Sequence, residues 1–259
     1  MSLVPTGGRP SGSVSSKGTA LITRSDVPPG TPYRECRQRL RRDFRYRCAY
    51  CGMTECEAQG IRMTIDHYEP RKVRPELEND YANLMYACDE CNLRKGDRSL
   101  PEPARADGFR FFRPDEDIDD DHFEEKGIRL VHKSNTGYYS VTALDLNRQS
   151  LRRLRELRER ADKSQSLVRE SMSKLLRFRI DQLPPILRAR ALRAIQNAAV
   201  TEEEISLRLN DLISEDARSP MLDPDVEADE RGQIRTAGLK ALQAKYRGNW
   251  RGPRRDASS

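Results

Sequence analysis

The stretch CDECNLRKG, residues 88–96, determines the fold that we predict for this chain. It contains two cysteines separated by two residues, with Asn92 directly after the second cysteine and Lys95 three residues further on. An earlier stretch, residues 48–51, repeats the cysteine spacing. Two pairs of this kind are typical of one tetrahedral zinc ion. The predicted zinc ligands are Cys48, Cys51, Cys88 and Cys91.

Four sulfur ligands close the coordination shell of zinc and leave no position for water. The predicted ion would therefore stabilise a segment that buries little apolar surface, and any reaction must use other residues. Cys36 and Cys56 have no partner at the same spacing, and we expect them to be ordinary small apolar residues.

The composition favours a solvated, basic protein without a membrane segment. Of 259 residues, 36% are hydrophobic and 34% charged, and the net charge of +6 is compatible with a polyanionic partner. No apolar run approaches the roughly 20 residues that cross a bilayer, and the N-terminus lacks the apolar core of a secretory signal. We therefore expect a soluble cytoplasmic protein with reduced thiols and no membrane partner.

Composition shifts divide the chain into four predicted segments of an α+β protein. Residues 1–32 are rich in Gly, Ser and Pro and predict a flexible tail, and residues 33–105 predict a zinc-stapled domain with an Arg-rich leading helix. Residues 106–148 predict an acidic loop and a β-hairpin, and residues 149–259 a helical region with a basic tail.

Periodicity places the individual elements. We predict a helix over 33–46, strands over 61–65 and 83–88, a loop over 68–80, a helix over 89–96, and a hairpin with strands 128–132 and 138–144. Further helices are predicted from 149 to about 175, over 186–200, over 201–213 and near 232–246. The acidic run 115–125 offers carboxylates for a divalent metal, but a solvated loop is the usual fate of such a run.

The side chains between the two cysteine pairs suggest a second metal. Asp66 ends the first predicted strand and Asn92 lies on the helix that carries a zinc ligand, so the zinc could bring a carboxylate and an amide oxygen together. Such oxygens suit Mg²⁺ or Mn²⁺. His67, adjacent to Asp66, is a natural general base for a water molecule because its ordinary pKa lies near 6.5.

Over about residues 45–100 the chain contains, in order, a CxxC pair, Asp-His, Asn, a second CxxC pair followed by Asn, and Lys. In this order it resembles the HNH endonucleases of the ββα-metal fold, in their four-cysteine branch. The resemblance implies that Asp66 and Asn92 ligate the catalytic ion, that His67 activates water and that Asn83 fixes the loop that orients the histidine. Lys95 would either cap a helix or contact phosphate. The third histidine of the family's name is absent and Asn92 takes its place, which leaves the identity of the metal open.

The remaining sequence favours a phosphodiester hydrolase that acts on DNA, with RNA and a non-catalytic zinc-binding module as alternatives. Residues 144–155, after the predicted hairpin, resemble HNH proteins found beside ABC-type ATPases in bacterial antiviral systems such as Septu, so an ATPase partner is one hypothesis. The other is that residues 150–215 form a packing or dimerisation layer. The expected nucleic-acid contacts are Arg37, Arg41, Arg42, Arg45 and Lys95.

Overall fold

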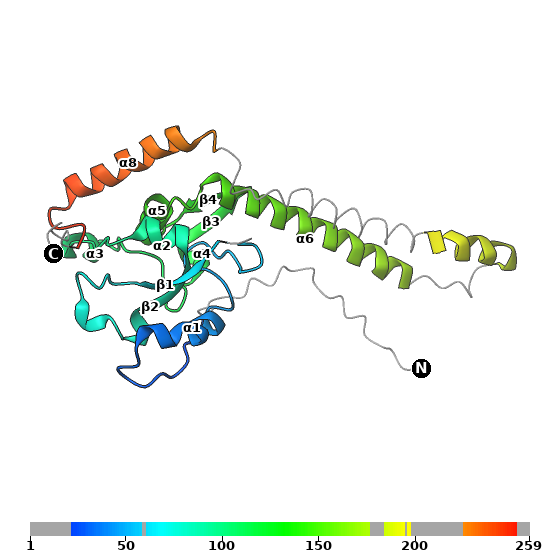
Figure 1. The fold of residues 1–259 in the computed structure, drawn as a ribbon. Helices are drawn as coiled ribbons and strands as arrows, with labels where there is room; N and C mark the ends of the chain where they lie inside the picture. The colour runs from blue at the N-terminus through cyan, green and yellow to red at the C-terminus, as the bar shows by residue number, and fades with distance from the viewer. Residues whose placement is uncertain (1–21, 59–60, 177–183, 195, 198–224, 253–259) are drawn as a thin grey trace, which may run out of the picture.

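A computed structural model describes residues 22–58, 61–176, 184–194, 196–197 and 225–252. Its elements gather around a small hairpin, and one long helix projects away from them (Figure 1). The first half contains η1 (Tyr33–Cys36), α1 (Arg37–Asp43), β1 (Met63–His67), η2 (Pro75–Leu77), η3 (Tyr81–Asn83), β2 (Leu84–Cys88), α2 (Asp89–Lys95) and α3 (Glu102–Ala106). The second half contains α4 (Asp119–His122), β3 (Phe123–Lys126), β4 (Arg129–His132), α5 (Asn135–Leu144), α6 (Gln149–Leu176) and α8 (Ala228–Lys245).

The centre of the fold is the antiparallel pair β1–β2, followed directly by α2. The pairing runs from Met63 opposite Cys88 to His67 opposite Leu84, and every residue of β2 is buried. The predicted strands over 61–65 and 83–88 and the helix over 89–96 are confirmed, with β1 starting two residues later than expected. The α+β class with a ββα core is therefore confirmed.

The Arg-rich leading segment packs its apolar stripe on β2. Cys36, Leu40 and Phe44 are buried at four-residue spacing, so they lie on one face of the η1–α1 segment. The arginines between them occupy the opposite, solvent-facing side. The predicted helix is therefore present, although its first turn is a 3-10 helix and it ends three residues before 46.

The predicted hairpin of residues 128–132 and 138–144 is wrong in its second strand. Residues 135–144 form the helix α5, and the partner of β4 is β3, joined to it by a tight turn at Gly127, where φ is 58°. Ser134 caps α5 by accepting a hydrogen bond from the Gly137 backbone N–H at 3.0 Å. Gly137 also packs so tightly that a Cβ there would lie 2.1 Å from the His122 carbonyl oxygen.

Two further predictions need correction. Residues 22–32 were expected in a flexible tail, but Arg24 bonds Asp115 at 2.7 Å and the Tyr81 and Leu84 carbonyl oxygens; residues 1–21 lie outside the described part. The acidic run 115–125 was expected to be a loop, but it contains α4 and the start of β3. Arginine side chains neutralise its first acids, since Asp117 pairs with Arg110.

The C-terminal region is helical where it is described. The long helix α6 and α8 confirm two predicted helices, and α8 lies across α5 (Figure 1). Residues 185–194 are helical, within the predicted 186–200 helix, whereas the predicted helix over 201–213 lies outside the described residues. Among the described helices, none combines the length and apolar character needed to cross a membrane.

Candidate metal centre and active site

The four predicted cysteines form a metal centre at the point where the loop after α1 meets β2 and α2. Their Sγ atoms all lie within 4.8 Å of one another, and Cys51 Sγ is 3.9 Å from Cys88 Sγ. Tetrahedral zinc with Zn–S bonds near 2.3 Å places its sulfurs about 3.8 Å apart. The cluster therefore fits a zinc ion, and within the described residues it is the one group of three or more His, Cys, Asp or Glu side chains with this geometry.

Local backbone geometry presents the first pair of sulfurs. The chain turns at Gly52, where φ is 68° and the backbone N–H donates to the Cys48 carbonyl at 3.0 Å. The Cys48 N–H donates to the Met53 carbonyl at 2.9 Å, which closes a tight turn over residues 48–53, the zinc knuckle. A further bond of 2.7 Å from the Ala49 N–H to the Tyr86 carbonyl ties this knuckle to β2, so both cysteine pairs are held by one hairpin.

Burial and mutual hydrogen bonds shift the pKa values of two of these thiols in opposite directions. Burial raises the pKa of Cys48, whereas hydrogen bonds, first of all from Cys48, hold the pKa of Cys51 below its ordinary value. Zinc binding must therefore release the remaining protons.

A residue outside the sequence motif supports this centre. Arg148, between α5 and α6, places Nη2 3.6 Å from Cys91 Sγ and pairs its Nε with Glu90 at 2.6 Å. Burial opposes its charge, but the Coulomb attraction of Cys91, Cys51 and Glu90 outweighs burial and raises the pKa of Arg148. No spacing in the sequence signalled this contact.

Asp66 and Asn92 lie in the same interface between β1 and α2, although each bonds to a different residue. Asn92 Nδ2 donates to Thr64 Oγ1 at 3.0 Å, and Thr64 and Asp66 share one face of β1 because side chains alternate along a strand. The predicted carboxylate and amide therefore come from opposite sides of one interface. The donor types suit a hard divalent cation.

The Asp66 carboxylate is occupied by two side chains in this structure. Lys95 Nζ lies 3.1 Å from its Oδ2, and the Tyr50 hydroxyl donates to the same oxygen. Burial, followed by the Asp66 charge, raises the pKa of Tyr50 well above its ordinary value, so this hydroxyl keeps its proton. The ammonium of Lys95 thus already neutralises the Asp66 carboxylate. In the sequence, the position of Tyr50 between Cys48 and Cys51 is the one feature that indicates a role near the site.

The prediction that Lys95 contacts nucleic acid is wrong for this structure. Its side chain is 0% exposed, and its Nζ also donates to the His67 carbonyl at 2.6 Å. It therefore links α2 to the end of β1 and does not cap a helix.

His67 points to the opposite face of β1 from Asp66. Its Nε2 lies 2.9 Å from the Glu78 carbonyl oxygen, and its ring meets Tyr33 edge-on at a centroid distance of 5.0 Å. A carbonyl only accepts hydrogen bonds, so Nε2 carries the proton and Nδ1 keeps the lone pair in the neutral ring. Burial lowers the pKa of His67 by more than the Glu78 carbonyl raises it, which favours the neutral form.

Asn83 holds the loop that contains this carbonyl. Its Oδ1 accepts from the Glu69 backbone N–H at 2.8 Å, and its Nδ2 donates to the Glu69 and Leu77 carbonyls at 3.1 and 3.2 Å. Since Leu77 precedes Glu78, the Asn83 amide fixes the segment against which His67 is oriented.

The arginines predicted to contact nucleic acid differ in whether their side chains are already engaged within the protein. Arg41 is engaged by Glu55 through two bonds of 2.6 Å, and Arg37 donates to the Met63 carbonyl at 2.6 Å. Arg42 and Arg45 are exposed and, among the described residues, have no carboxylate partner.

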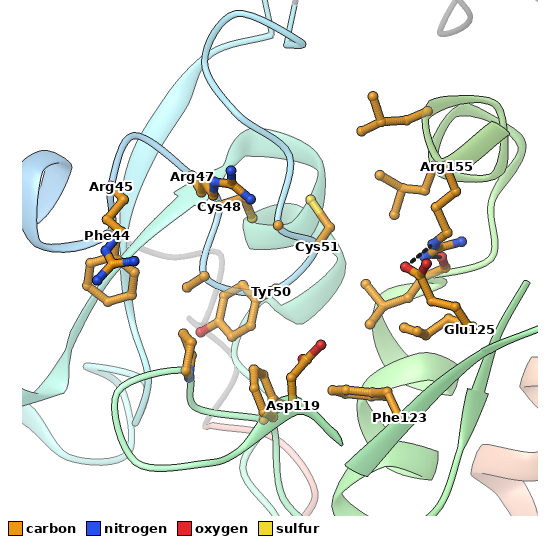
Figure 2. A pocket seen from close by; sticks show the side chains of 18 of the residues that line it. Phe44, Arg45, Arg47, Cys48, Tyr50, Cys51, Asp119, Phe123, Glu125 and Arg155 are labelled. Atoms are coloured by element: carbon orange, nitrogen blue, oxygen red, sulfur yellow. Dashed lines mark hydrogen bonds and ion pairs between the residues drawn. The ribbon is translucent and has the colours of Figure 1, made fainter. Parts of the chain in front are cut away.

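A cavity of about 440 Å³ opens beside the zinc knuckle, between it and the β3–β4 side of the molecule. Figure 2 shows Phe44, Tyr50 and Phe123 around it, with Arg45 and Arg47 on one side and Arg155, paired with Glu125, on the other. Asp66 and His67 do not line it. The cavity is therefore separate from the proposed reactive side chains.

Comparison with known proteins agrees with this geometry. Residues 48–98 match the family model of the HNH endonucleases. This segment is an HNH domain. The match begins at Cys48 and ends just after α2, so the HNH domain contains the four-cysteine cluster, Asp66, His67, Asn83 and Asn92.

A more extended similarity links the chain to a protein of Bacillus thuringiensis. Septu protein PtuB is 29% identical over 104 residues, which cover 39% of this chain and 37% of that relative. The chain therefore spans well under half the length of the relative that it matches.

Proposed function

We propose that the HNH domain is a metal-dependent endonuclease that hydrolyses phosphodiester bonds in DNA, with His67 as the general base. The observation that carries this proposal is the 2.9 Å bond between His67 Nε2 and the Glu78 carbonyl. It leaves Nδ1 as the atom that can take a proton from water. A surface histidine without such a bond would have no fixed tautomer.

Asp66 and Asn92 are the proposed ligands of a catalytic Mg²⁺ or Mn²⁺ ion. When bound, such an ion supplies charge stabilisation at the phosphate and its leaving oxygen. Because Lys95 is paired with Asp66, the proposal requires that its ammonium move when the cation binds. Asn83 acts through the loop at Leu77, so we propose it as a positioning residue.

The substrate and the biological setting are proposed from the comparisons with known proteins. DNA is the proposed substrate on the strength of the HNH family match, with RNA as the alternative. The similarity to a Septu protein supports a role as a nuclease effector in bacterial antiviral defence, and an ABC-type ATPase is then the proposed partner. The C-terminal helices are also proposed for homo-oligomer contacts, because Ile186, Leu187 and Leu192 are exposed on the helix of residues 185–194.

One assay tests the proposed activity. Purified protein is incubated with plasmid DNA and with an RNA of similar length, in Mg²⁺ or Mn²⁺, beside the His67→Ala variant. We expect nicking or cutting that His67→Ala abolishes, while both proteins keep about one zinc per chain. Equal activity of the two proteins would refute the role of His67. If both are inactive, the test is repeated with candidate ATPase partners added.

A non-catalytic zinc module is the second candidate, because Asp66 is 5% exposed and already paired. Such a module needs the four cysteines but not His67 or Asn92. Unchanged nucleic-acid binding with no cleavage by any preparation, and no effect of Asn92→Ala, would favour it.

A further inference from the structure

The turn between α1 and the zinc knuckle has an unusual backbone. Arg45 and Tyr46 have φ values of 50° and 60°, in the left-handed region that residues other than glycine seldom adopt. Within the described chain, the single other non-glycine residue with positive φ is Asp145, whose carboxylate pairs with Arg94 and Arg231. Strained conformations persist where the surroundings fix them, and they concentrate at functional sites.

Neighbouring segments hold this turn in place. The Tyr46 N–H donates to the Arg41 carbonyl and the Glu55 N–H donates to the Tyr46 carbonyl, both at 2.9 Å. Arg47 pairs with Thr54 in an antiparallel bridge, and the next residue is the zinc ligand Cys48. The position of Tyr46 is therefore set by the zinc knuckle as well as by α1.

A fixed cation lies against the Tyr46 ring. The Arg41 guanidinium is 5.0 Å from the ring centroid and donates two bonds of 2.6 Å to Glu55. Glu55 also accepts the Tyr86 hydroxyl of β2 at 2.6 Å, so the stack is anchored to the central hairpin. Tyr46 nevertheless remains 47% exposed. One side of the ring is supported by Arg41, and its exposed part is available to a planar group.

Three arginines close to Tyr46 in the sequence carry unpaired positive charge. Arg42, Arg45 and Arg47 are all exposed, and none of them pairs with a carboxylate among the residues that the structure describes. Arg45 and Arg47 also face the cavity shown in Figure 2. An exposed aromatic ring among free arginines combines the two interactions that single-stranded nucleic acids use, base stacking and phosphate contact.

We propose that this turn, residues 42–47, binds a locally single-stranded nucleic acid, with a base stacked on Tyr46 and phosphates contacted by Arg42, Arg45 and Arg47. The inference rests on the proposed function in one respect, the nucleic-acid substrate. The turn follows the far end of the η1–α1 segment, whose first residue, Tyr33, contacts the His67 ring. The 11 helical residues of this segment, 4 in η1 and 7 in α1, span about 19 Å. A strand with B-form spacing covers that length with roughly six phosphates.

Binding is measured with the full-length His67→Ala protein and no added divalent metal, so that cleavage does not interfere. The probe is a labelled oligonucleotide of about 12 residues that contains 2-aminopurine, beside the same sequence as a duplex. We expect tighter binding of the single strand and quenching of 2-aminopurine by stacking. Tyr46→Ala should weaken binding about 5- to 150-fold and remove the quenching, whereas Tyr46→Phe should retain both.

A second variant separates binding from folding. Arg45→Gly removes one cation and relaxes the positive φ, so its melting temperature should equal or exceed that of the parent protein. Its affinity should nevertheless fall, and the slope of log K against log salt should decrease by about 0.7. Lys240→Ala, an exposed lysine on α8, is the matched control and should change neither quantity.

The two proposals fail in different ways. If Tyr46→Ala binds the oligonucleotide as tightly as the parent, or quenching persists in it, the stacking site is refuted whatever the plasmid assay shows. If Tyr46→Ala loses binding but the wild-type protein cuts neither DNA nor RNA, alone or with candidate ATPase partners, the site stands and the proposed nuclease activity fails.

Discussion

Lys95 Nζ lies 3.1 Å from Asp66 Oδ2 in the interface between β1 and α2, where the two side chains are 0% and 5% exposed. The same ammonium donates to the His67 carbonyl at 2.6 Å. One lysine therefore holds together the adjacent residues to which we assign metal binding and water activation. A buried carboxylate needs a positive partner, and in this structure Lys95 provides it.

Replacing Lys95 should reveal whether a cation can take its place. Lys95→Met leaves Asp66 buried with Tyr50 as its hydrogen-bond donor, so we expect the free energy of unfolding to fall by about 3–5 kcal/mol. Mg²⁺ at millimolar concentration should then raise the melting temperature of this variant more than that of the wild type. Circular dichroism with and without Mg²⁺ measures both effects.

The exposed Lys240→Met is the control for loss of a lysine, and Lys95→Met combined with Asp66→Asn is the control for the site. An equal response to Mg²⁺ in the single and double variants would show that the cation does not bind at Asp66.

The pH dependence should follow from the burial of His67. Burial lowers its pKa below the ordinary value near 6.5, so between the two values the unfolded chain binds a proton that the folded chain does not. The contribution of neutral His67 to the free energy of unfolding is therefore complete above pH 6.5. It is lost as the pH falls toward the pKa of His67 in the folded protein. The neutral ring is also the proposed base, so the acid limb of kcat/KM should have its midpoint below 6.5.

Cleavage rates from pH 5 to 8 and an NMR titration of the His67 ring measure these quantities. The His67→Gln variant should lose the corresponding pH dependence of its stability. An acid limb at or above 6.5 would contradict the assignment.

Asn83 should affect the reaction through the position of the 69–78 loop. Asn83→Ala removes three buried hydrogen bonds, and we expect a loss of about 2–4 kcal/mol in the free energy of unfolding. The Glu78 carbonyl would then orient His67 less well, so kcat should fall with little change in KM.

Asn83→Asp retains an acceptor for the Glu69 N–H but loses both donors, and it should resemble Asn83→Ala more than the wild type. A change confined to KM in either variant would place Asn83 in substrate binding instead.

The HNH domain was predictable because its metal-binding and proposed reactive residues lie close together in the sequence. The spacing of the cysteine pairs predicts the four-cysteine cluster, and Asp66, His67, Asn83 and Asn92 lie in or beside the expected elements. The burial of Lys95 was not predictable, because the same lysine on an isolated helix would face solvent. Only the β1–α2 packing determines its environment.

The second half of the chain shows where local sequence misleads. The segment 138–144 contains tyrosine, valine and threonine, which favour strands, yet it forms α5. The Ser134 cap and the close approach of Gly137 to His122 outweigh that preference. β3 was missed because one of its four residues, Phe123, is buried, so its sequence shows charge and no alternation.

Arg148 provides the last prediction, because it connects the second half of the chain to the zinc centre. Its Nη2 lies 3.6 Å from Cys91 Sγ, and it offsets part of the negative charge that four thiolates bring to a zinc ion. Arg148→Met should therefore weaken zinc binding by about 10-fold or more, measured as zinc transfer to a chromogenic chelator. Arg152→Met, a buried arginine paired with Glu227, is the matched control and should leave zinc affinity unchanged. Equal zinc release from both variants would show that Arg148 serves packing between α2 and the α5–α6 turn and does not stabilise the metal centre. Arg148→Lys should lie between the wild type and Arg148→Met, because the charge is kept and the contact of the guanidinium with sulfur is not.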